Sequence, residues 1–346
     1  MTPRVLGPVV LLMLAVAPAV TAQPKKETKV AILLAPAGAG DKGFNDAALA
    51  GIEAARKHGR VHTSVRMAPK ADEYDAMIER VVADHPELVI GVGFLYLEPF
   101  KAAAPRHPGV RFLLLDVALA DLPNVRSVTF RADEGSFLAG VAASAESKGG
   151  HVGFVGAMHL PVIEAFECGY ETGIRWAAKE LFRTVRGHAA YIGTTHEAFS
   201  NPKEAASLTR TMAEQHGVDV IYAAAGASGL GMIDAARQLN IRAIGVDADQ
   251  RHVAPDTVIT SMRKRLDRAV EMAIADVRRG SYSGGAGVMT LANQGVDLVA
   301  PGRLSPATVK LVEKARAALV SGKAQPCEKA EAKPPAWNFP PRPAAP

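Results

Sequence analysis

Acidic residues and glycines directly follow several short apolar runs in this sequence. Asp116 follows the run RFLLL, Asp247 ends the run RAIGVD, and Gly226 follows the run DVIYAAA. Unbroken apolar runs bounded by Gly, Pro or Asp are typical of parallel strands that are buried on both faces. Because ligands of parallel sheets bind at the carboxyl ends of the strands, the three residues are candidates for a common binding site.

The loop after the first apolar run, KVAILLAP, matches the dinucleotide-binding pattern G-x-G-x-x-G at Gly38, Gly40 and Gly43. Asp41 in this loop would place a negative charge beside a pyrophosphate, which disfavours such a cofactor. The next strand candidate, HTSVRMAPK, ends without the acid that binds an NAD ribose, and its Arg66 would support only NADP. We therefore expect no cofactor.

Motifs of the common enzyme mechanisms are missing from the sequence. It contains no G-x-S-x-G, G-x-x-x-x-G-K-[ST] or H-E-x-x-H segment. The histidines are scattered, and Gly59 ends the helix that would place His58 and His62 on one face, so no metal site is expected. Two cysteines, Cys168 and Cys327, are too few for a Cys-based zinc site, and the sequence leaves open whether they form a disulfide. The protein is therefore not expected to be an enzyme.

Helix-like stretches, with apolar residues three or four positions apart, alternate with the apolar runs. The predicted strands are 29–36, 88–94, 111–116, 151–157, 189–194, 219–225 and 242–247. The predicted helices are 45–58, 73–84, 134–147, 161–179, 202–216 and 230–239. Repeated βα units predict a doubly wound α/β fold, and a single such sheet rarely holds this many strands and helices. We expect two Rossmann-like lobes with parallel sheets, joined by a hinge.

The two lobes are predicted to use alternating parts of the chain. The N-terminal lobe is assigned residues 28–129 and 249–288, and the C-terminal lobe residues 130–248 and 289–322. Residues 323–346 are rich in Pro and Ala, a composition typical of a tail that forms no packed core.

The first residues have the pattern of a secretory signal. Residues 1–22 combine the early cation Arg4 with an apolar run from Val5 to about Val20, and a cleavage site is expected near Ala22. The run is too short for a membrane span, which needs about 20 apolar residues. No cysteine lies near the cleavage site, so we expect a periplasmic protein without a lipid anchor.

The composition is that of an ordinary globular protein. A chain of 346 residues, 48% of them apolar, is long enough for two cores. The formal net charge of +5 is spread along the chain without a block of like charges, which argues against nucleic acid as a partner.

Longer segments of the chain carry a family pattern in a fixed order. They include GDKGFNDAALAGIEAA (40–55), HPGVRFLLLD (107–116), EGSFLAGVAAS (134–144), GVDVIYAAAGASGLGMIDAA (217–236) and TSMRKRLDRAV (260–270). The chain thereby resembles the basic membrane protein family, the PnrA-like purine-nucleoside-binding proteins of ABC importers. The resemblance covers the chain up to about Gly322 and implies a type I periplasmic-binding-protein fold, in which two lobes close on a ligand.

The resemblance also implies ligand-binding roles for individual residues. They are Asp41, Phe44, Asn45, Asp116, Phe199, Gly226, Asp247 and Lys264. Phe44 and Phe199 would stack on the two faces of a purine. The loop of Asp41 and Asn45, together with Asp116, would contact the edge of the base, and Asp247, Lys264 and the backbone at Gly226 would bind the sugar hydroxyls. Each side chain also has a structural alternative, such as a core phenylalanine, a helix cap or a solvated lysine.

One position departs from the family pattern. Family members commonly carry an Asp at the end of the first strand, nine residues before the first stacking phenylalanine. This chain has Ala35 there, followed by Pro36, and neither side chain can accept a hydrogen bond. Another group must supply this contact, or the ligand differs in its ring.

The resemblance implies a monomeric, non-enzymatic receptor that captures a nucleoside-like small molecule and delivers it to an ABC permease. Binding of a free nucleobase or a flavin-like ligand remains an alternative, as do an exported α/β hydrolase and a signalling input domain. The separation of the acids on different strands argues against a nucleoside hydrolase, which would need clustered acids around a cation.

Overall fold

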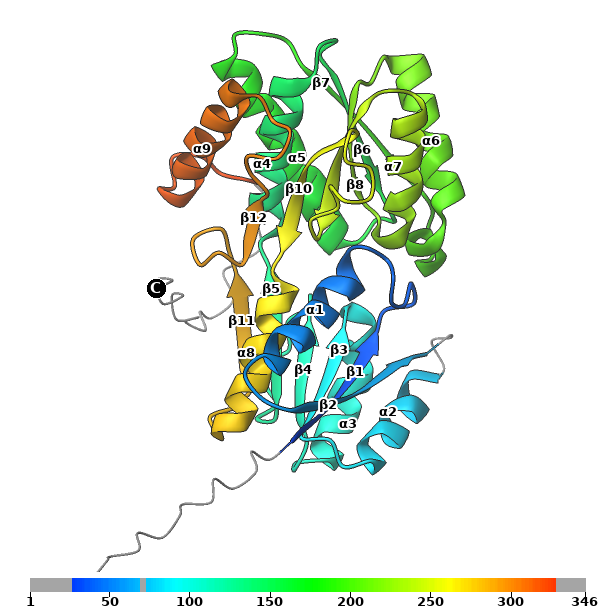
Figure 1. The fold of residues 1–346 in the computed structure, drawn as a ribbon, viewed down its shortest axis with the longest axis vertical. Helices are drawn as coiled ribbons and strands as arrows, with labels where there is room; N and C mark the ends of the chain where they lie inside the picture. The colour runs from blue at the N-terminus through cyan, green and yellow to red at the C-terminus, as the bar shows by residue number, and fades with distance from the viewer. Residues whose placement is uncertain (1–26, 69–72, 328–346) are drawn as a thin grey trace, which may run out of the picture.

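Two six-stranded β-sheets organise the chain, one in each of two lobes stacked along the long axis of the molecule (Figure 1). The computed structural model describes residues 27–68 and 73–327. The predicted signal peptide and most of the predicted tail lie outside these ranges. The prediction of an α/β fold with two lobes built on parallel sheets is confirmed.

The six strands of the N-terminal sheet are all parallel. In spatial order they are β11 (Gly285–Met289), β5 (Val125–Phe130), β4 (Arg111–Leu115), β3 (Leu88–Val92), β1 (Thr28–Leu34) and β2 (Val61–Met67). The helices of this lobe are α1 (Phe44–Arg56), α2 (Tyr74–Ala83), α3 (Leu97–Ala103) and α8 (Leu266–Arg279). Alternate residues of β1 belong to different cores: Val30 clusters with α1 and α8, whereas Ala31 clusters with α2 and α3. Because both faces are covered, the inner strands β1, β3 and β4 consist largely of apolar residues, whereas the inner strand β5 also contains Arg126, Ser127 and Thr129.

The C-terminal sheet is parallel except at one edge. In spatial order its strands are β12 (Val296–Leu298), β10 (Val258–Lys264), β9 (Arg242–Asp247), β8 (Val220–Ala224), β6 (His151–Gly156) and β7 (Arg186–Tyr191), with β12 antiparallel to β10. Its helices are α4 (Ala132–Glu146), α5 (Pro161–Glu180), α6 (Pro202–His216), α7 (Gly229–Gln238) and α9 (Pro306–Val320). Glycines let α4 and α5 approach closely, since a Cβ on Gly140 would lie 2.2 Å from the carbonyl oxygen of Tyr170.

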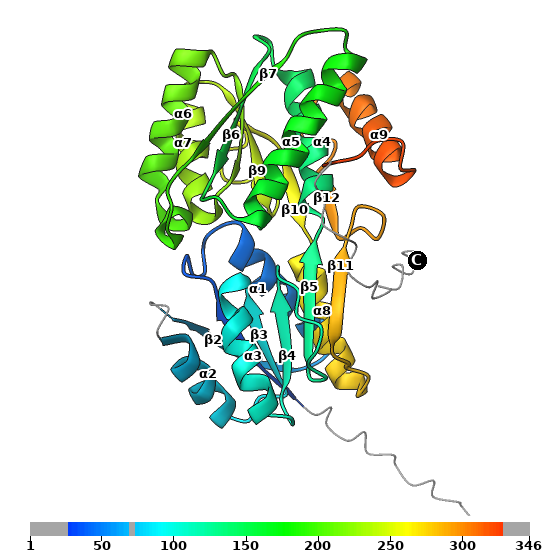
Figure 2. The same ribbon diagram turned by 180° about the vertical axis from the view of Figure 1, so that it is seen from behind.

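The chain crosses between the lobes three times. It crosses between β5 and α4, between β10 and α8, and between β11 and β12. Backbone hydrogen bonds join these crossings, from Arg131 N to Met289 O (2.8 Å) and from Arg265 N to Gly295 O (2.9 Å). Figure 2 shows β5 and β11 side by side where they approach the C-terminal lobe.

The strand β10 corrects the predicted lobe boundaries. Residues 249–288 were predicted to belong to the N-terminal lobe, but β10 pairs with β9 in the C-terminal sheet. The second crossing therefore follows Lys264 and not residue 248. This strand was not predicted because it contains the polar residues Thr260 and Ser261. Both are fully buried, since their hydroxyl groups have hydrogen-bond partners: Thr260 Oγ1 donates to Val299 O, and Ser261 Oγ accepts from Gln250 N.

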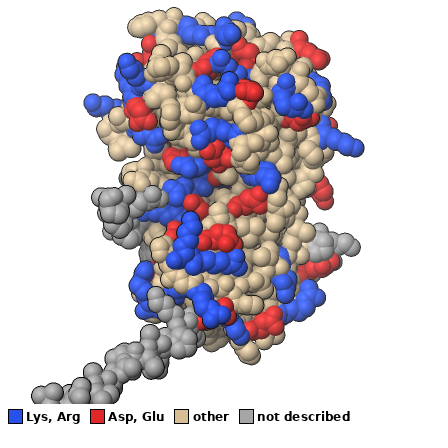
Figure 3. Space-filling model, in the orientation of Figure 1, with Lys and Arg blue, Asp and Glu red and all other residues tan. Residues whose placement is uncertain are grey.

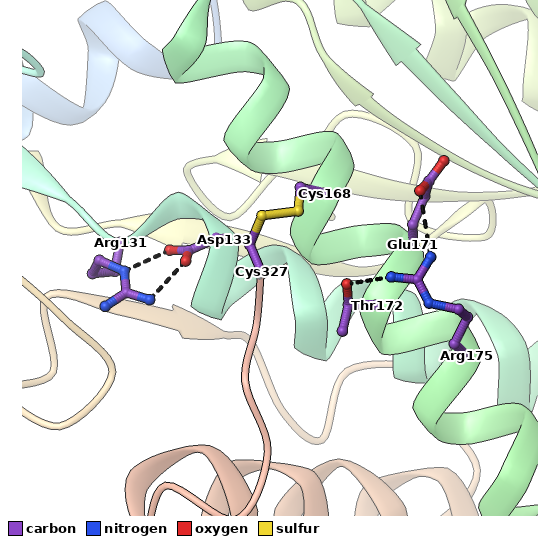
Figure 4. The surroundings of a disulfide bond; sticks show 7 residues. All are labelled: Arg131, Asp133, Cys168, Glu171, Thr172, Arg175 and Cys327. Carbon is purple, nitrogen blue, oxygen red and sulfur yellow. Dashed lines mark hydrogen bonds and ion pairs between the residues drawn. A yellow bond between two sulfur atoms is a disulfide. The ribbon is translucent and has the colours of Figure 1, made fainter. Parts of the chain in front are cut away.

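A disulfide joins Cys168 on α5 to Cys327 after α9 (Figure 4). The two Cα atoms lie 5.6 Å apart and are separated by 159 residues in sequence. The beginning of the predicted tail is thus attached to the C-terminal lobe, and Ala324 is buried in its core. The sequence left open whether Cys168 and Cys327 form a disulfide, and the structure shows that they do.

Acidic and basic side chains are interspersed over the face of the molecule shown in Figure 3. This mixture agrees with the even spread of charge along the sequence. Within the described part of the chain, none of the helices is both long and apolar enough to cross a bilayer.

Candidate functional site

A cleft lies at the junction of the two lobes, and residues of both lobes line it. From the N-terminal lobe these are Ala35, Pro36, Ala37, Asp41, Phe44, Asn45, Val92, Gly93, Phe94, Leu95 and Asp116. From the C-terminal lobe they are Val162, Ile163, Phe166, His196, Phe199, Ala224, Gly226, Asp247 and Lys264. The structure therefore brings all eight residues predicted from the sequence to one cleft.

Two acids enter the cleft from the carboxyl ends of strands. Asp116 directly follows β4, and Asp247 is the last residue of β9. Both have left-handed backbone conformations, with φ of 72° and 64°. Asp adopts this left-handed conformation more readily than most residues do, so it is suited to both positions.

Lys264, at the end of β10, connects the acids with the aromatic residues. Its Nζ lies 2.8 and 2.7 Å from the two carboxylate oxygens of Asp116, and both side chains are at least 90% buried. The same Nζ lies 4.8 Å from the ring centre of Phe166 and 5.5 Å from that of Phe44. The ammonium group is thus held by an ion pair and by cation–π contacts.

Asp247 is a buried acceptor whose capacity is not used. It is 7% exposed, and its Oδ1 has no hydrogen-bond partner among the described residues. Burial raises the pKa of Asp247 to about 7, against the opposing effect of the Lys264 cation. A buried, unpaired carboxylate oxygen is costly, so this group is suited to a ligand that donates hydrogen bonds to it.

The pKa of Asp247 predicts a pH-dependent cost to the unliganded fold. Its folded-state pKa lies above the ordinary 3.8, so the protonated form stabilises the fold fully below about pH 3.8, and this contribution is lost as the pH rises from there to about 7. Asn resembles the protonated acid and tolerates the same backbone conformation. We expect Asp247→Asn to raise the free energy of unfolding relative to wild type at pH 8, by at most about 4 kcal/mol, and by less than half of that amount at pH 5. Urea unfolding of both proteins at the two pH values measures this. A variant that is less stable at pH 8, or a difference independent of pH, would contradict the assignment.

Asp41 and Asn45 line the cleft, but their polar atoms serve the chain itself. The Asp41 carboxylate accepts the backbone N–H groups of Gly43, Asn45 and Asp46 at 3.0, 2.8 and 3.1 Å, and so caps α1. Asn45 Oδ1 accepts from Ala35 N at 2.9 Å, which fixes the end of β1. Figure 1 shows the loop before α1 reaching toward the C-terminal lobe, where Gln250 Nε2 donates to Lys42 O (3.1 Å).

Several residues that line the cleft were not predicted from the sequence, among them the aromatic residues Phe94, Phe166 and His196. Phe94 follows β3 and contacts the opposite lobe, with its ring centre 6.4 Å from that of Phe199 and 5.6 Å from that of His196. Its position at the carboxyl end of a predicted strand was the signal that pointed to it. Phe166 projects from α5, where its spacing matches that of an ordinary core residue.

In residues 27–68 and 73–327, no group of three or more His, Cys, Asp or Glu side chains is arranged to hold a metal ion. The polar groups of the cleft, which include Oδ1 of Asp247, suit an organic ligand with hydrogen-bond donors. They lie beside aromatic rings, which suit a flat apolar surface on the same ligand.

Comparisons with known proteins place this chain among transport proteins. Residues 28–325 match the family model of the PnrA-like ABC transporter substrate-binding proteins. The ABC transporter nucleoside-binding protein BmpA of Lactococcus lactis is 29% identical over 86% of this chain and 89% of its own length. An uncharacterized lipoprotein of Pyrococcus horikoshii is 34% identical over 78% of this chain and 68% of its own length.

Solved structures agree with this assignment. The crystal structure of an ABC transporter solute-binding protein from Aeropyrum pernix superposes with a TM-score of 0.78 and 27% identity, covering 86% of this chain and 92% of that one. The family consists of extracytoplasmic binding proteins, not of enzymes, so the hydrolase alternative is set aside. This chain belongs to the PnrA-like family of ABC transporter substrate-binding proteins.

Proposed function

We propose that this protein captures a purine nucleoside between its two lobes and delivers it to an ABC permease. One observation carries the proposal: Phe44 and Phe199, from different lobes, line the same cleft as Asp247, whose Oδ1 has no hydrogen-bond partner among the described residues. Two aromatic rings suit the two faces of a base, and the carboxylate suits the hydroxyls of a ribose. The nucleoside-binding name of the L. lactis relative points to the same ligand class.

Each part of a nucleoside has a matching group in the cleft. Stacking of a base on an aromatic side chain is worth about 1–3 kcal/mol. A carboxylate accepts two hydrogen bonds from neighbouring hydroxyls, and an ammonium group both donates to a hydroxyl and compensates the buried negative charge. Asp247 and Lys264 are the groups we assign to the ribose, with the backbone at Gly226 close by.

A free nucleobase fits the site less well. It would bring no hydroxyl to Asp247 Oδ1, which would stay buried without a partner at a cost of about 1–3 kcal/mol. A flavin-like ligand with a polyol chain would provide hydroxyls that donate to Asp247 Oδ1. Riboflavin is therefore tested together with the nucleosides.

Thermal unfolding in the presence of inosine, guanosine, adenosine, adenine and riboflavin tests the ligand class. A ligand at 100 times its Kd stabilises the folded protein by about 2.7 kcal/mol. We expect the nucleosides to raise the melting temperature and to be recovered unchanged. A response to riboflavin alone, or to no compound, would contradict the proposal.

Phe199→Ala is expected to weaken inosine binding about 5- to 150-fold, because it removes one stacking surface. The ring lines the cleft and is only partly buried, so the melting temperature of the unliganded protein should change little. Phe182→Ala is the matched control, since Phe182 is 96% exposed and should leave binding unchanged. Isothermal titration calorimetry measures both. Equal affinities of the two variants, or unfolding of the Phe199 variant, would show that Phe199 does not stack on the ligand.

The proposed location is the periplasm. The family is extracytoplasmic, while the predicted signal segment lies outside the described residues. The predicted absence of a lipid anchor stays a prediction, because relatives such as the P. horikoshii protein are named lipoproteins.

A further inference from the structure

The polar side chains that line the cleft are unevenly distributed. Those with nitrogen or oxygen atoms are Asp41, Asn45, Asp116, His196, Asp247 and Lys264. Asp41 is occupied by three backbone N–H groups, and Asn45 by the backbone of Ala35. The remaining groups are His196 and one cluster formed by Asp116, Asp247 and Lys264.

The three members of this cluster act together. Lys264 bonds both oxygens of Asp116, and the charges of Lys264 and Asp116 both act on Asp247. His196 belongs to the segment before α6, and its exposed side chain packs on the ring of Phe94. The buried side-chain groups that remain available to hydrogen-bond a ligand are therefore concentrated in the Asp116–Asp247–Lys264 cluster.

The wall formed by Ala35, Pro36, Ala37, Val92 and Leu95 is apolar. The backbone of Ala35 is also occupied, since its N–H donates to Asn45 Oδ1 and its carbonyl accepts from Gly38 N at 2.9 Å. This wall adjoins the Phe44 ring: a Cβ placed on Gly93 would lie 3.4 Å from Phe44 Cε1 and 3.9 Å from Ala35 Cβ.

We infer that the cleft recognises the ring of its ligand by stacking and shape, without hydrogen bonds to the ring substituents, and recognises the ribose by hydrogen bonds. The inference rests on the proposed function, because it assumes that the ring lies between Phe44 and Phe199. If the ribose binds to the cluster of Asp116, Asp247 and Lys264, the edge of the ring that points away from the ribose lies against the apolar wall. The ligand class is then purine ribosides with an unsubstituted or apolar ring edge as well as those with an oxo or amino group.

The expected discrimination follows from this arrangement. A site built to hydrogen-bond a substrate group rejects an analogue without that group by about 10⁴- to 10⁵-fold, because its buried partner is left unpaired. Here the apolar wall loses no partner when the ring substituent is removed. An oxo group or ring N–H finds no side-chain partner on the wall, so inosine gains no affinity over the unsubstituted riboside at this position.

Isothermal titration with inosine, purine riboside, 6-methylpurine riboside and 2′,3′-dideoxyinosine tests the inference. We expect the first three to bind with Kd values within about tenfold of one another, and the dideoxy compound to bind at least about tenfold more weakly because Asp247 loses its donors. Inosine binding more than about 100-fold tighter than purine riboside would overturn the inference and leave the proposed function intact. If no riboside binds, the proposed function fails as well.

A substitution in the wall provides a second test. Ala35→Asp would place an acceptor beside the ring and is expected to favour inosine over purine riboside by at least about tenfold, through one charge-assisted hydrogen bond. Ala39→Asp is the matched control, because it adds the same charge at an exposed position outside the cleft lining. Equal preferences of the two variants would place the ring edge away from Ala35 and overturn the inference.

Discussion

Replacement of Lys264 by methionine is expected to abolish nucleoside binding and to destabilise the fold by about 3–5 kcal/mol. Methionine keeps much of the side-chain volume but removes the charge that compensates Asp116 and Asp247. The Lys264 side chain is 2% exposed and that of Asp116 is 10% exposed, so water cannot replace the lost partner. Urea unfolding at neutral pH measures the stability, and calorimetry measures the binding.

Two further variants separate the ion pair from other effects of this change. Arg263→Met removes a cation from the neighbouring residue, whose pair with Asp297 is 34% and 23% exposed, and should cost at most about 1 kcal/mol. Adding Asp116→Asn to Lys264→Met removes one stranded charge and should restore part of the stability, without restoring binding. Equal effects of the Lys264 and Arg263 variants would show that the buried pair has no special role.

Removal of the disulfide is expected to have an effect of similar size. Cys168→Ser together with Cys327→Ser should lower the free energy of unfolding by about 2–5 kcal/mol, since the bond closes a long loop of the unfolded chain. The bond also attaches the segment after α9 to α5, the helix that carries Val162, Ile163 and Phe166 into the cleft. Thermal unfolding with and without a reductant measures the effect.

The control for this prediction is the same reductant on the double variant. Reduction should lower the melting temperature of the wild type and leave that of the double variant unchanged. A wild-type melting temperature that does not respond to complete reduction would contradict a stabilising role for the bond.

Much of the fold could be predicted because the inner strands are buried on both faces. The run LVIGVGF predicted β3, in which all five residues are buried, and Pro202–His216 predicted α6 to the residue. The predicted strand 189–194 was observed three residues earlier, at Arg186–Tyr191. This is the edge strand of its sheet, where polar residues such as Arg186 are exposed and carry no apolar signal.

Strands with polar or small residues were harder to predict. β10 contains Thr260 and Ser261, whose hydroxyls bond to neighbouring backbone and are therefore buried without being apolar. β11 is GAGVM and β12 has three residues, so neither provides a hydrophobic pattern. These strands pair with residues distant in sequence, which local patterns cannot show.

The candidate site was predicted more completely than the strands that carry it. Acids and glycines at strand ends converge because parallel strands end at the same edge of a sheet, and the family resemblance added Phe44, Phe199 and Lys264. What could not be predicted is how the polar atoms are used. Asn45 accepts a hydrogen bond from the backbone of Ala35, whereas Asp247 Oδ1 has no partner among the described residues. These contacts depend on distances between loops, which the sequence does not specify.

A crystal structure of the protein in complex with inosine tests the central claim most directly. We predict that the hypoxanthine ring lies between the faces of Phe44 and Phe199, with ribose hydroxyls within hydrogen-bonding distance of Asp247 Oδ1 and Lys264 Nζ. A hypoxanthine ring bound outside the cleft, or a ribose directed away from Asp247 and Lys264, would contradict the proposed mode of binding.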